Sequence, residues 1–263
     1  MIVRAQPATW QHAVQLGAQG LYAAADDTLA TLSQPGGTWI SLALSTCASH
    51  RRQIGATAEA ARLDGEALRC ATDSESIADA LVGLAADAIA SGDAEQAGAW
   101  HADASQPAET GWRTLTRWHW VGAERALLVG DQVAATEHAR VALEVCTGQS
   151  ARHEAKSRII SAAVTGRIED LPAVSPLLRA EGWVTLEWPL ALVAADHPQA
   201  ARPGGSAKPP LSGYAAWLAA SWATGRAATY SIEESLPAAL RPTWLHHPGV
   251  RRLRSERPPA GGE

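Results

Sequence analysis

The sequence predicts an all-helical protein built as a row of helix pairs. Its 263 residues are rich in Ala, Leu, Arg and Glu, which favour helices, and poor in the β-branched and aromatic runs typical of strands. Five glycines recur at intervals of 35 to 38 residues, at Gly20, Gly55, Gly92, Gly130 and Gly166. A constant period of this length indicates stacked helical hairpins.

Each pair is expected to contain one helix, a turn at one of these glycines, and a second helix. From first to last, the pairs are 8–24 with 26–33, 38–55 with 56–71, 76–92 with 94–104, 112–130 with 131–146, and 151–166 with 168–182. Asp73, Asp93 and Ser150 are the expected N-caps, because their side-chain oxygens can accept hydrogen bonds from first-turn amides. Pro172 and Pro176 predict a short or broken last helix, since proline is tolerated only in the first helical turn.

The remaining third of the chain is less regular. Residues 183–196 predict a helix that begins near Pro189, and a helix at 214–225 is expected to have a partner between Ser231 and Leu240. The sequence therefore divides into a helical-hairpin array at 1–182, C-terminal helices at 183–246 joined by a Pro/Gly-rich connection at 197–213, and a basic tail at 247–263 that is expected to be disordered and solvated.

Small residues surround each turn glycine at fixed distances. Seven residues before it stand Ala13, Ala48, Ala85 and Ala123, with Ile159 in the fifth pair. Five residues after it stand Ala25, Ala60, Ala97 and Ala135, with Leu171 in the fifth pair. Twelve residues after it stand Ala67, Ala104 and Ala142, with Leu32 and Leu178 in the end pairs. Small side chains at these positions allow the two helices of a hairpin to approach closely.

These positions resemble the signature of the tetratricopeptide repeat (TPR) family, and Leu44 and Leu81 match its large residue eleven before the glycine. The sequence departs from the family in spacing, which is usually about 34 residues. It also lacks the bulky aromatic four before the glycine, where it has Arg51, Ala88, Ala126 and Ala162. The resemblance covers about residues 8–182. It implies a right-handed α-solenoid of about five hairpins, which the later helices would cap.

In proteins of this kind the first helix of each pair lines a concave groove. The groove-facing positions lie roughly thirteen, ten, six, three and two residues before the glycine, which is the spacing of one helical face. They select Ser45, Ser49, Arg52, Gln53, Asp79, Val82, Ala86, Ile89, Arg117, Trp120, Glu124, Leu127, His153, Lys156 and Ile160. The residues that we take as the candidate binding site are Arg52, Gln53, Arg117, Trp120, Glu124, His153 and Lys156.

Arg and Trp often anchor binding surfaces. Arg117, Trp120, His153 and Lys156 could together hold a carboxylate or an acidic peptide through charge-assisted hydrogen bonds. The alternative is structural: Glu124 would pair with Arg117 or Lys156, contributing about 0.2–1 kcal/mol if exposed, and Trp120 would be a core residue.

No catalytic motif is present, and no two histidines have the i, i+4 spacing of a helical zinc site. We therefore expect a non-enzymatic module that needs no cofactor or metal and binds a protein or peptide segment, with an acidic segment fitting the basic side chains. Two alternatives remain open. The protein could be a homo-oligomeric scaffold, a homodimer for example, or a small-ligand-sensing regulatory domain that acts through a partner protein.

Composition and charge narrow the range of partners and the cellular location of the protein. A net charge of −5 and a pI near 6.0 argue against general nucleic-acid affinity. No apolar run reaches the length of a membrane span, and the N-terminus lacks the pattern of a signal peptide. Three cysteines without CxxC spacing suit a reducing compartment, so we expect a cytoplasmic protein. The absence of Phe and the scarcity of Lys suggest a bacterial gene from a GC-rich genome.

Overall fold

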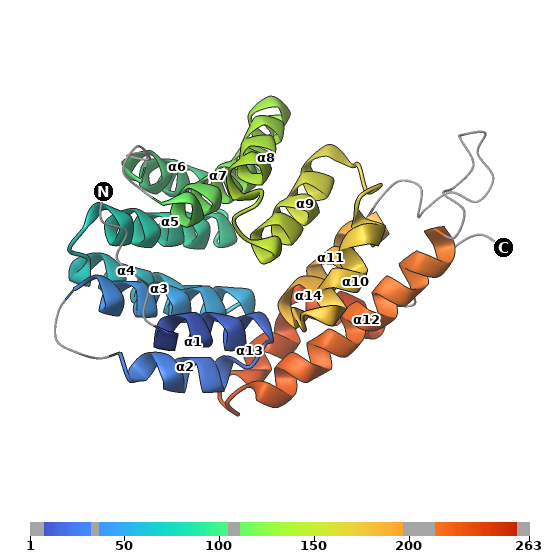
Figure 1. The fold of residues 1–263 in the computed structure, drawn as a ribbon, viewed down its shortest axis with the longest axis horizontal. Coiled ribbons are helices and arrows are strands. Elements are labelled where there is room, and N and C mark those ends of the chain that lie inside the picture. The colour runs from blue at the N-terminus through green and yellow to red at the C-terminus, as the bar shows by residue number, and fades with distance from the viewer. Residues whose placement is uncertain (1–7, 33–36, 105–110, 197–213, 257–263) are drawn as a thin grey trace.

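The computed structural model describes residues 8–32, 37–104, 111–196 and 214–256, and within these ranges the chain is helical and contains no strand (Figure 1). The expectation of an all-α protein is therefore confirmed for this part of the chain. The helices are α1 (Ala8–Ala18), α2 (Tyr22–Ala30), α3 (Thr38–Gln53), α4 (Thr57–Cys70), α5 (Ser74–Ala90), α6 (Ala94–Asp103), α7 (Trp112–Leu128), α8 (Gln132–Cys146), α9 (Ala151–Thr165), α10 (Leu171–Ala180), α11 (Val184–Asp196), α12 (Tyr214–Ser235), α13 (Arg241–His246) and α14 (Pro248–Ser255).

The periodic glycines form the turns within the first five hairpins. Their φ angles lie between 68° and 87°, in the left-handed region where a side chain is strained. The expected caps are also present, since the side chains of Asp73, Asp93 and Ser150 accept hydrogen bonds from the amides of Ser76, Gln96 and His153. The spaced alanines lie between the paired helices, and each is at most 3% exposed. Local sequence thus sets both the turn and the close packing of each hairpin.

The first helices of the hairpins form a closed circuit. Each of α1, α3, α5, α7, α9 and α11 contacts the next one, and α11 also contacts α1. The second helices pack against them, as α4 does on α3 and α8 on α7. In Figure 1 the C-terminal helices accordingly lie beside α1 and α2.

Side-chain contacts join the two ends of this circuit. Thr185 Oγ1 donates a 3.0 Å hydrogen bond to the carbonyl oxygen of Ala18, and Ser235 Oγ donates one to the carbonyl oxygen of Gly20. Ile232 of α12 and Tyr22 of α2 are buried in one apolar cluster, at 0% and 1% exposure. The C-terminal helices pack on the fifth pair, as a cap would, but they also pack on the first pair.

Several elements near the C-terminus differ from the sequence-based expectations. Helix α11 begins at Val184 and continues through Pro189. Helix α10 is short, as expected, with ten residues, but it is not broken at Pro176. Helix α12 is one helix of 22 residues, where a helix at 214–225 and a separate partner between Ser231 and Leu240 were expected. A Cβ at Gly225 would lie 2.6 Å from that of Ala191, so this glycine permits close packing on α11 and does not end the helix.

The tail expected to be disordered contains a helix where the structure describes it. Residues 248–255 form α14, which buries Val250 and Leu253 completely. Arg254 donates to the hydroxyl of Thr229 at 2.9 Å and to the carboxylate of Glu233 at 2.7 Å. The polar composition of this segment concealed an amphipathic helix, which packs on α11, α12 and α13. The Pro/Gly-rich connection at 197–213 and the last residues, from 257, lie outside the described residues.

None of the described helices combines the length and the apolar character that crossing a membrane would require.

Candidate functional site

The circuit of first helices lines a partly open cavity of about 480 Å³. Its polar lining comes mainly from α3, α7 and the first turns of α9, and its apolar lining includes the later turns of α9 and α11. The polar and charged lining residues are Ser45, Thr46, Ser49, His50, Arg52, Gln53, Arg113, Arg117, Glu124, Arg152, His153, Lys156, Thr185 and His247. The large apolar ones are Val14, Val82, Trp120, Val121, Leu127, Ile159, Ile160, Val164, Leu186, Trp188, Pro189 and Val193.

All seven residues chosen from the sequence as the candidate site border this one cavity. Of the wider set selected by the groove-facing offsets, Asp79 and Ile89 do not border it. Asp79 is 1% exposed and lies behind two arginines, whereas Ile89 packs against the apolar cluster between α5 and α7. The structure thus places these side chains together, and their binding role remains a hypothesis.

Arg52 is held by two buried carboxylates behind the cavity wall. Its Nη2 lies 2.5 Å from Asp64 Oδ2, and its Nε lies 2.6 Å from Asp87 Oδ1. Burial raises the pKa of both carboxyl groups, and the guanidinium of Arg52 opposes that shift. Helix α5 lies so close to α4 here that a Cβ at Gly83 would overlap the carboxylate of Asp64.

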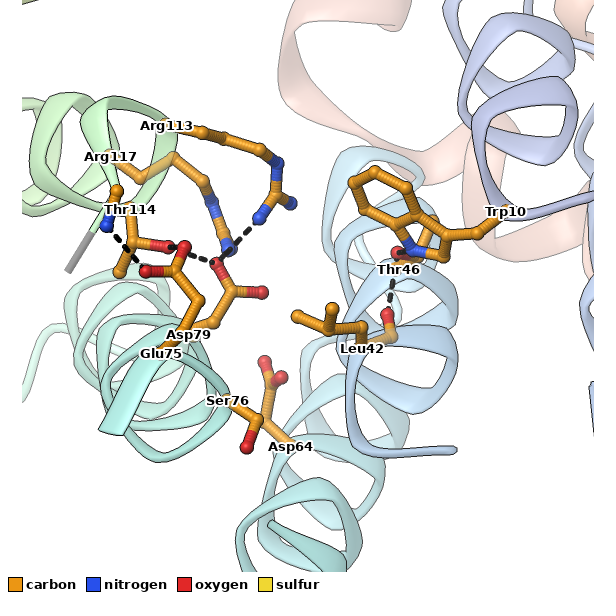
Figure 2. A network of polar contacts seen from close by, with 12 residues as sticks. Trp10, Leu42, Thr46, Asp64, Glu75, Ser76, Asp79, Arg113, Thr114 and Arg117 are labelled. Carbon is orange, nitrogen blue, oxygen red and sulfur yellow. Dashed lines mark hydrogen bonds and ion pairs between the residues drawn. The ribbon is translucent and has the colours of Figure 1, made fainter. Parts of the chain in front are cut away.

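Arg113 and Arg117 share a third buried carboxylate, that of Asp79 on α5. Arg113 Nη1 lies 3.0 Å from Asp79 Oδ1, and Arg117 reaches the same oxygen (Figure 2). Burial alone would raise the pKa of Asp79, but the two guanidinium groups hold it below its usual value. The structural alternative had Glu124 pair with Arg117 or Lys156, but Arg117 pairs with Asp79.

Trp120 is buried at 5% exposure and supports two other candidate residues. Its indole Nε1 donates to Ser157 Oγ at 2.8 Å, which fixes the ring. The His153 ring stacks on it with a centroid distance of 5.3 Å, and Lys156 Nζ lies 4.1 Å from its centroid. Burial, reinforced by neighbouring Arg113 and other cations, keeps the pKa of His153 far below its usual value. His153 is consequently neutral, and the cationic member of this group is Lys156.

Arg152 lines the cavity without an acidic partner among the described residues. Within the described part of the chain it forms no ion pair with a carboxylate, and its buried Nε has no hydrogen-bond partner. Its one hydrogen bond runs from Nη2 to Thr185 Oγ1, at 3.4 Å. Burial, with the charge of Arg113, lowers its pKa, which means that the folded protein disfavours this charge in its present surroundings.

Lys156 stands four residues after Arg152, so both side chains leave the same face of α9. Burial lowers the pKa of Lys156 to about 8, and three nearby guanidinium groups, on Arg152, Arg117 and Arg52, add to this effect. Glu124 opposes it, yet no carboxylate of the described residues lies within ion-pair distance of Lys156. The wall therefore carries two cations, Arg152 and Lys156, without a directly bonded anion.

Some residues of the cavity wall were not among those selected from the sequence. Arg113 and Arg152 each lie four residues before a chosen cation, Arg117 and Lys156, and this i, i+4 spacing could have identified them. The α11 residues that line the cavity, by contrast, could not be identified from the repeat, because α11 follows the five repeated pairs.

A second cluster of titratable side chains lies outside the cavity, where α6, α7 and α8 meet. His119 Nδ1 and His138 Nδ1 are 3.0 Å apart, and the rings of His101 and Trp118 stack at 4.1 Å. Burial lowers the pKa of His101 and of His119 to about 4. Among the described residues no group of three or more His, Cys, Asp or Glu side chains is arranged to hold a metal ion.

No family model matches the chain, and neither a curated protein nor a solved structure matches it. The residues of the cavity indicate its chemistry. They form an apolar region, the face of the Trp120 ring, and two cations, Arg152 and Lys156, that lack bonded anions among the described residues.

Proposed function

We propose that the central cavity binds a small organic anion with an apolar body, and that the protein acts as a ligand-binding module rather than as a catalyst. The observation that carries this proposal is Arg152, which lines the cavity without an acidic partner. A buried cation is costly unless a charged or hydrogen-bonding partner accompanies it. A carboxylate, sulfonate or phosphate in the cavity would supply that partner.

The balance of charge supports an anion over a cation or a neutral ligand. Arg52, Arg113 and Arg117 are compensated by the aspartates behind the wall. Arg152 has no carboxylate partner among the described residues, and Lys156 has only the more distant charge of Glu124. An anion that reaches both α9 cations would form charge-assisted hydrogen bonds in a partly desolvated site, where such bonds are strongest.

Size favours a small molecule over a continuous peptide. A cavity of about 480 Å³ falls within the range of about 300–1,000 Å³ that is usual for small-molecule sites. Contacts between α11 and α1 join the ends of the circuit that an open groove would leave apart. The peptide-groove hypothesis concerns the same wall, and a carboxylate at the end of a peptide would meet the same cations.

The left-handed turn glycines and the buried spaced alanines also support a TPR-like origin of the hairpins. Under this proposal the hairpins form a TPR-like solenoid, and its last helices contact the first pair and close it into a ring.

A direct test uses two fluorescent probes that differ mainly in charge. Anilinonaphthalene sulfonate carries a sulfonate, and N-phenyl-1-naphthylamine is uncharged. We expect Arg152→Gln to weaken binding of the sulfonate by about tenfold, the equivalent of about 1.4 kcal/mol, and to leave the neutral probe nearly unaffected. Arg167→Gln is the matched control, because Arg167 is exposed and does not line the cavity. Equal effects of Arg152→Gln on both probes would contradict the proposal.

The homodimer alternative is favoured by one observation at the α7–α8 turn. Leu128, Val129 and Val133 are 42%, 51% and 82% exposed, and such a group of apolar side chains is typical of an interaction surface. Light scattering at micromolar concentration, compared with the Val133→Asp variant, tests whether a second copy covers it. A monomer in both samples would exclude this candidate.

A further inference from the structure

Lys156 differs chemically from every other cation in the cavity wall. The 22 basic residues of the chain include only two lysines, Lys156 and Lys208, and Lys208 lies outside the described residues. A guanidinium binds anions through a planar fork of donors and stays charged, whereas an amine can lose its proton and act as a nucleophile. The cavity therefore contains one side chain that is able to form a covalent bond with a carbonyl group.

The position of Lys156 makes its neutral amine more accessible than that of an exposed lysine, although the ammonium still predominates at pH 7. Its Nζ lies 4.1 Å from the centroid of the Trp120 ring, and no carboxylate of the described residues pairs with it. The ring attracts an ammonium. Burial and the positive charges of Arg152, Arg117 and Arg52 act in the opposite direction, and the resulting pKa is about 8. An amine next to other cations in a desolvated pocket is a recognised way to activate lysine.

We propose that Lys156 forms an imine with an aldehyde or ketone that also carries an anionic group, and that Arg152 holds this group. The two side chains lie one helical turn apart on the same face of α9 and line the same cavity. The inference rests on the proposed function, because the cavity must first bind the anion, and it specifies the chemical class of the ligand.

The reaction needs no oxidant or cofactor. The neutral amine of Lys156 attacks the carbonyl carbon, and the proton that it loses passes to the carbonyl oxygen. The resulting carbinolamine then releases water and leaves a C=N bond to Nζ. Glu124 lines the same cavity and could carry the proton between these atoms. The Trp120 ring, beside Nζ, offers a flat surface on which a conjugated imine can stack.

The experiment uses pyridoxal 5′-phosphate, which combines an aldehyde with a phosphate. The full-length protein is incubated with the probe and reduced with borohydride, and the modified peptides are identified by mass spectrometry. At pH 7.5 we expect Lys156 to be modified about tenfold faster than Lys208, because a larger fraction of its amine is unprotonated. The rate should rise with pH and level off above about pH 8.

Two comparisons make the test specific. Lys156→Arg should remove the label from the cavity peptide while Lys208 is still labelled slowly. Arg152→Gln should slow labelling by pyridoxal 5′-phosphate about tenfold and leave labelling by pyridoxal, which lacks the phosphate, nearly unchanged. Equal labelling of Lys156 and Lys208 in the wild-type protein would overturn the inference.

Failure of this inference and failure of the proposed function give different results. Pyridoxine 5′-phosphate has the same phosphate but no aldehyde, and its displacement of anilinonaphthalene sulfonate from the wild-type protein measures non-covalent binding alone. Displacement without trapping of Lys156 would reject the imine and retain the anion site. Absence of both would reject the two proposals together.

Discussion

Thr185 Oγ1 donates a hydrogen bond of 3.0 Å to the carbonyl oxygen of Ala18, which lies 167 residues earlier in the chain. This contact joins α11 to α1 and completes the circuit of helices around the cavity. A repeat array that closes in this way has no free first or last pair. The stability of the first hairpin should therefore depend on the last helices.

Replacing Ile232 with Ala tests this dependence. Ile232 is completely buried in the cluster that contains Tyr22, so its truncation should lower the free energy of unfolding by about 2–4 kcal/mol. Hydrogen exchange should also become faster in α1 and α2, although the change lies on α12. Ile77→Ala is the control, because Ile77 is 40% exposed and its loss should cost less than about 1 kcal/mol. Unchanged protection of α1 and α2 in Ile232→Ala would show that the ring closure contributes little.

Two helical glycines should respond in opposite directions to the same substitution. Gly83→Ala places a methyl group where the carboxylate of Asp64 lies, and we expect it to lower the free energy of unfolding by about 1–3 kcal/mol. Gly65→Ala, on α4, meets no heavy atom within 4 Å and should stabilise the protein by about 0.5–1 kcal/mol through helix propensity. Urea denaturation of both variants checks the pair. Stabilisation by Gly83→Ala would contradict the close approach of α5 to Asp64.

Two cavity arginines should also differ in their effect on stability. Arg52→Met leaves the buried carboxylates of Asp64 and Asp87 without their cation and should cost about 3–5 kcal/mol. Arg152→Met removes a half-buried charge that has no carboxylate partner among the described residues, so we expect unchanged or slightly increased stability, by up to about 1 kcal/mol. Thermal and urea unfolding measure both. If Arg152→Met were as damaging as Arg52→Met, Arg152 would have a structural role that its contacts do not show.

The lowered pKa of Lys156 predicts a pH dependence of stability. Between about pH 8 and pH 10.5 the unfolded chain holds a proton on Lys156 that the folded protein has released. Folding should therefore become more favourable as pH rises through this window, by at most about 1.4 kcal/mol per pH unit, and this contribution is lost as pH falls from about 10.5 to about 8. Comparison with Lys156→Met by urea denaturation at pH 7, 8, 9 and 10 isolates the effect. A constant difference between the two proteins over this range would exclude it.

The hairpins and much of the cavity wall follow from local sequence. The turn glycines have positive φ, and the alanines at fixed distances from them are buried, because both requirements act within one hairpin. The groove-facing offsets located Arg117, Trp120 and Lys156 on the cavity wall, since one helical face always turns the same way. The same offsets wrongly placed Asp79 on the cavity wall. Arg113 and Arg117 of the neighbouring helix α7 lie between Asp79 and the cavity, and the spacing within α5 carries no information about them.

The sequence by itself determined that the chain is helical, where five hairpins turn, and most of the inward-facing positions on the first helices of pairs two to five. Those properties depend on backbone preferences and periodicity over a few turns. Only the tertiary structure decided that α11 meets α1, that α14 is helical, and that Arg152 and Lys156 remain without bonded carboxylates while Arg52 and Arg117 have them. These outcomes depend on contacts between residues far apart in the chain, and no local pattern encodes such contacts.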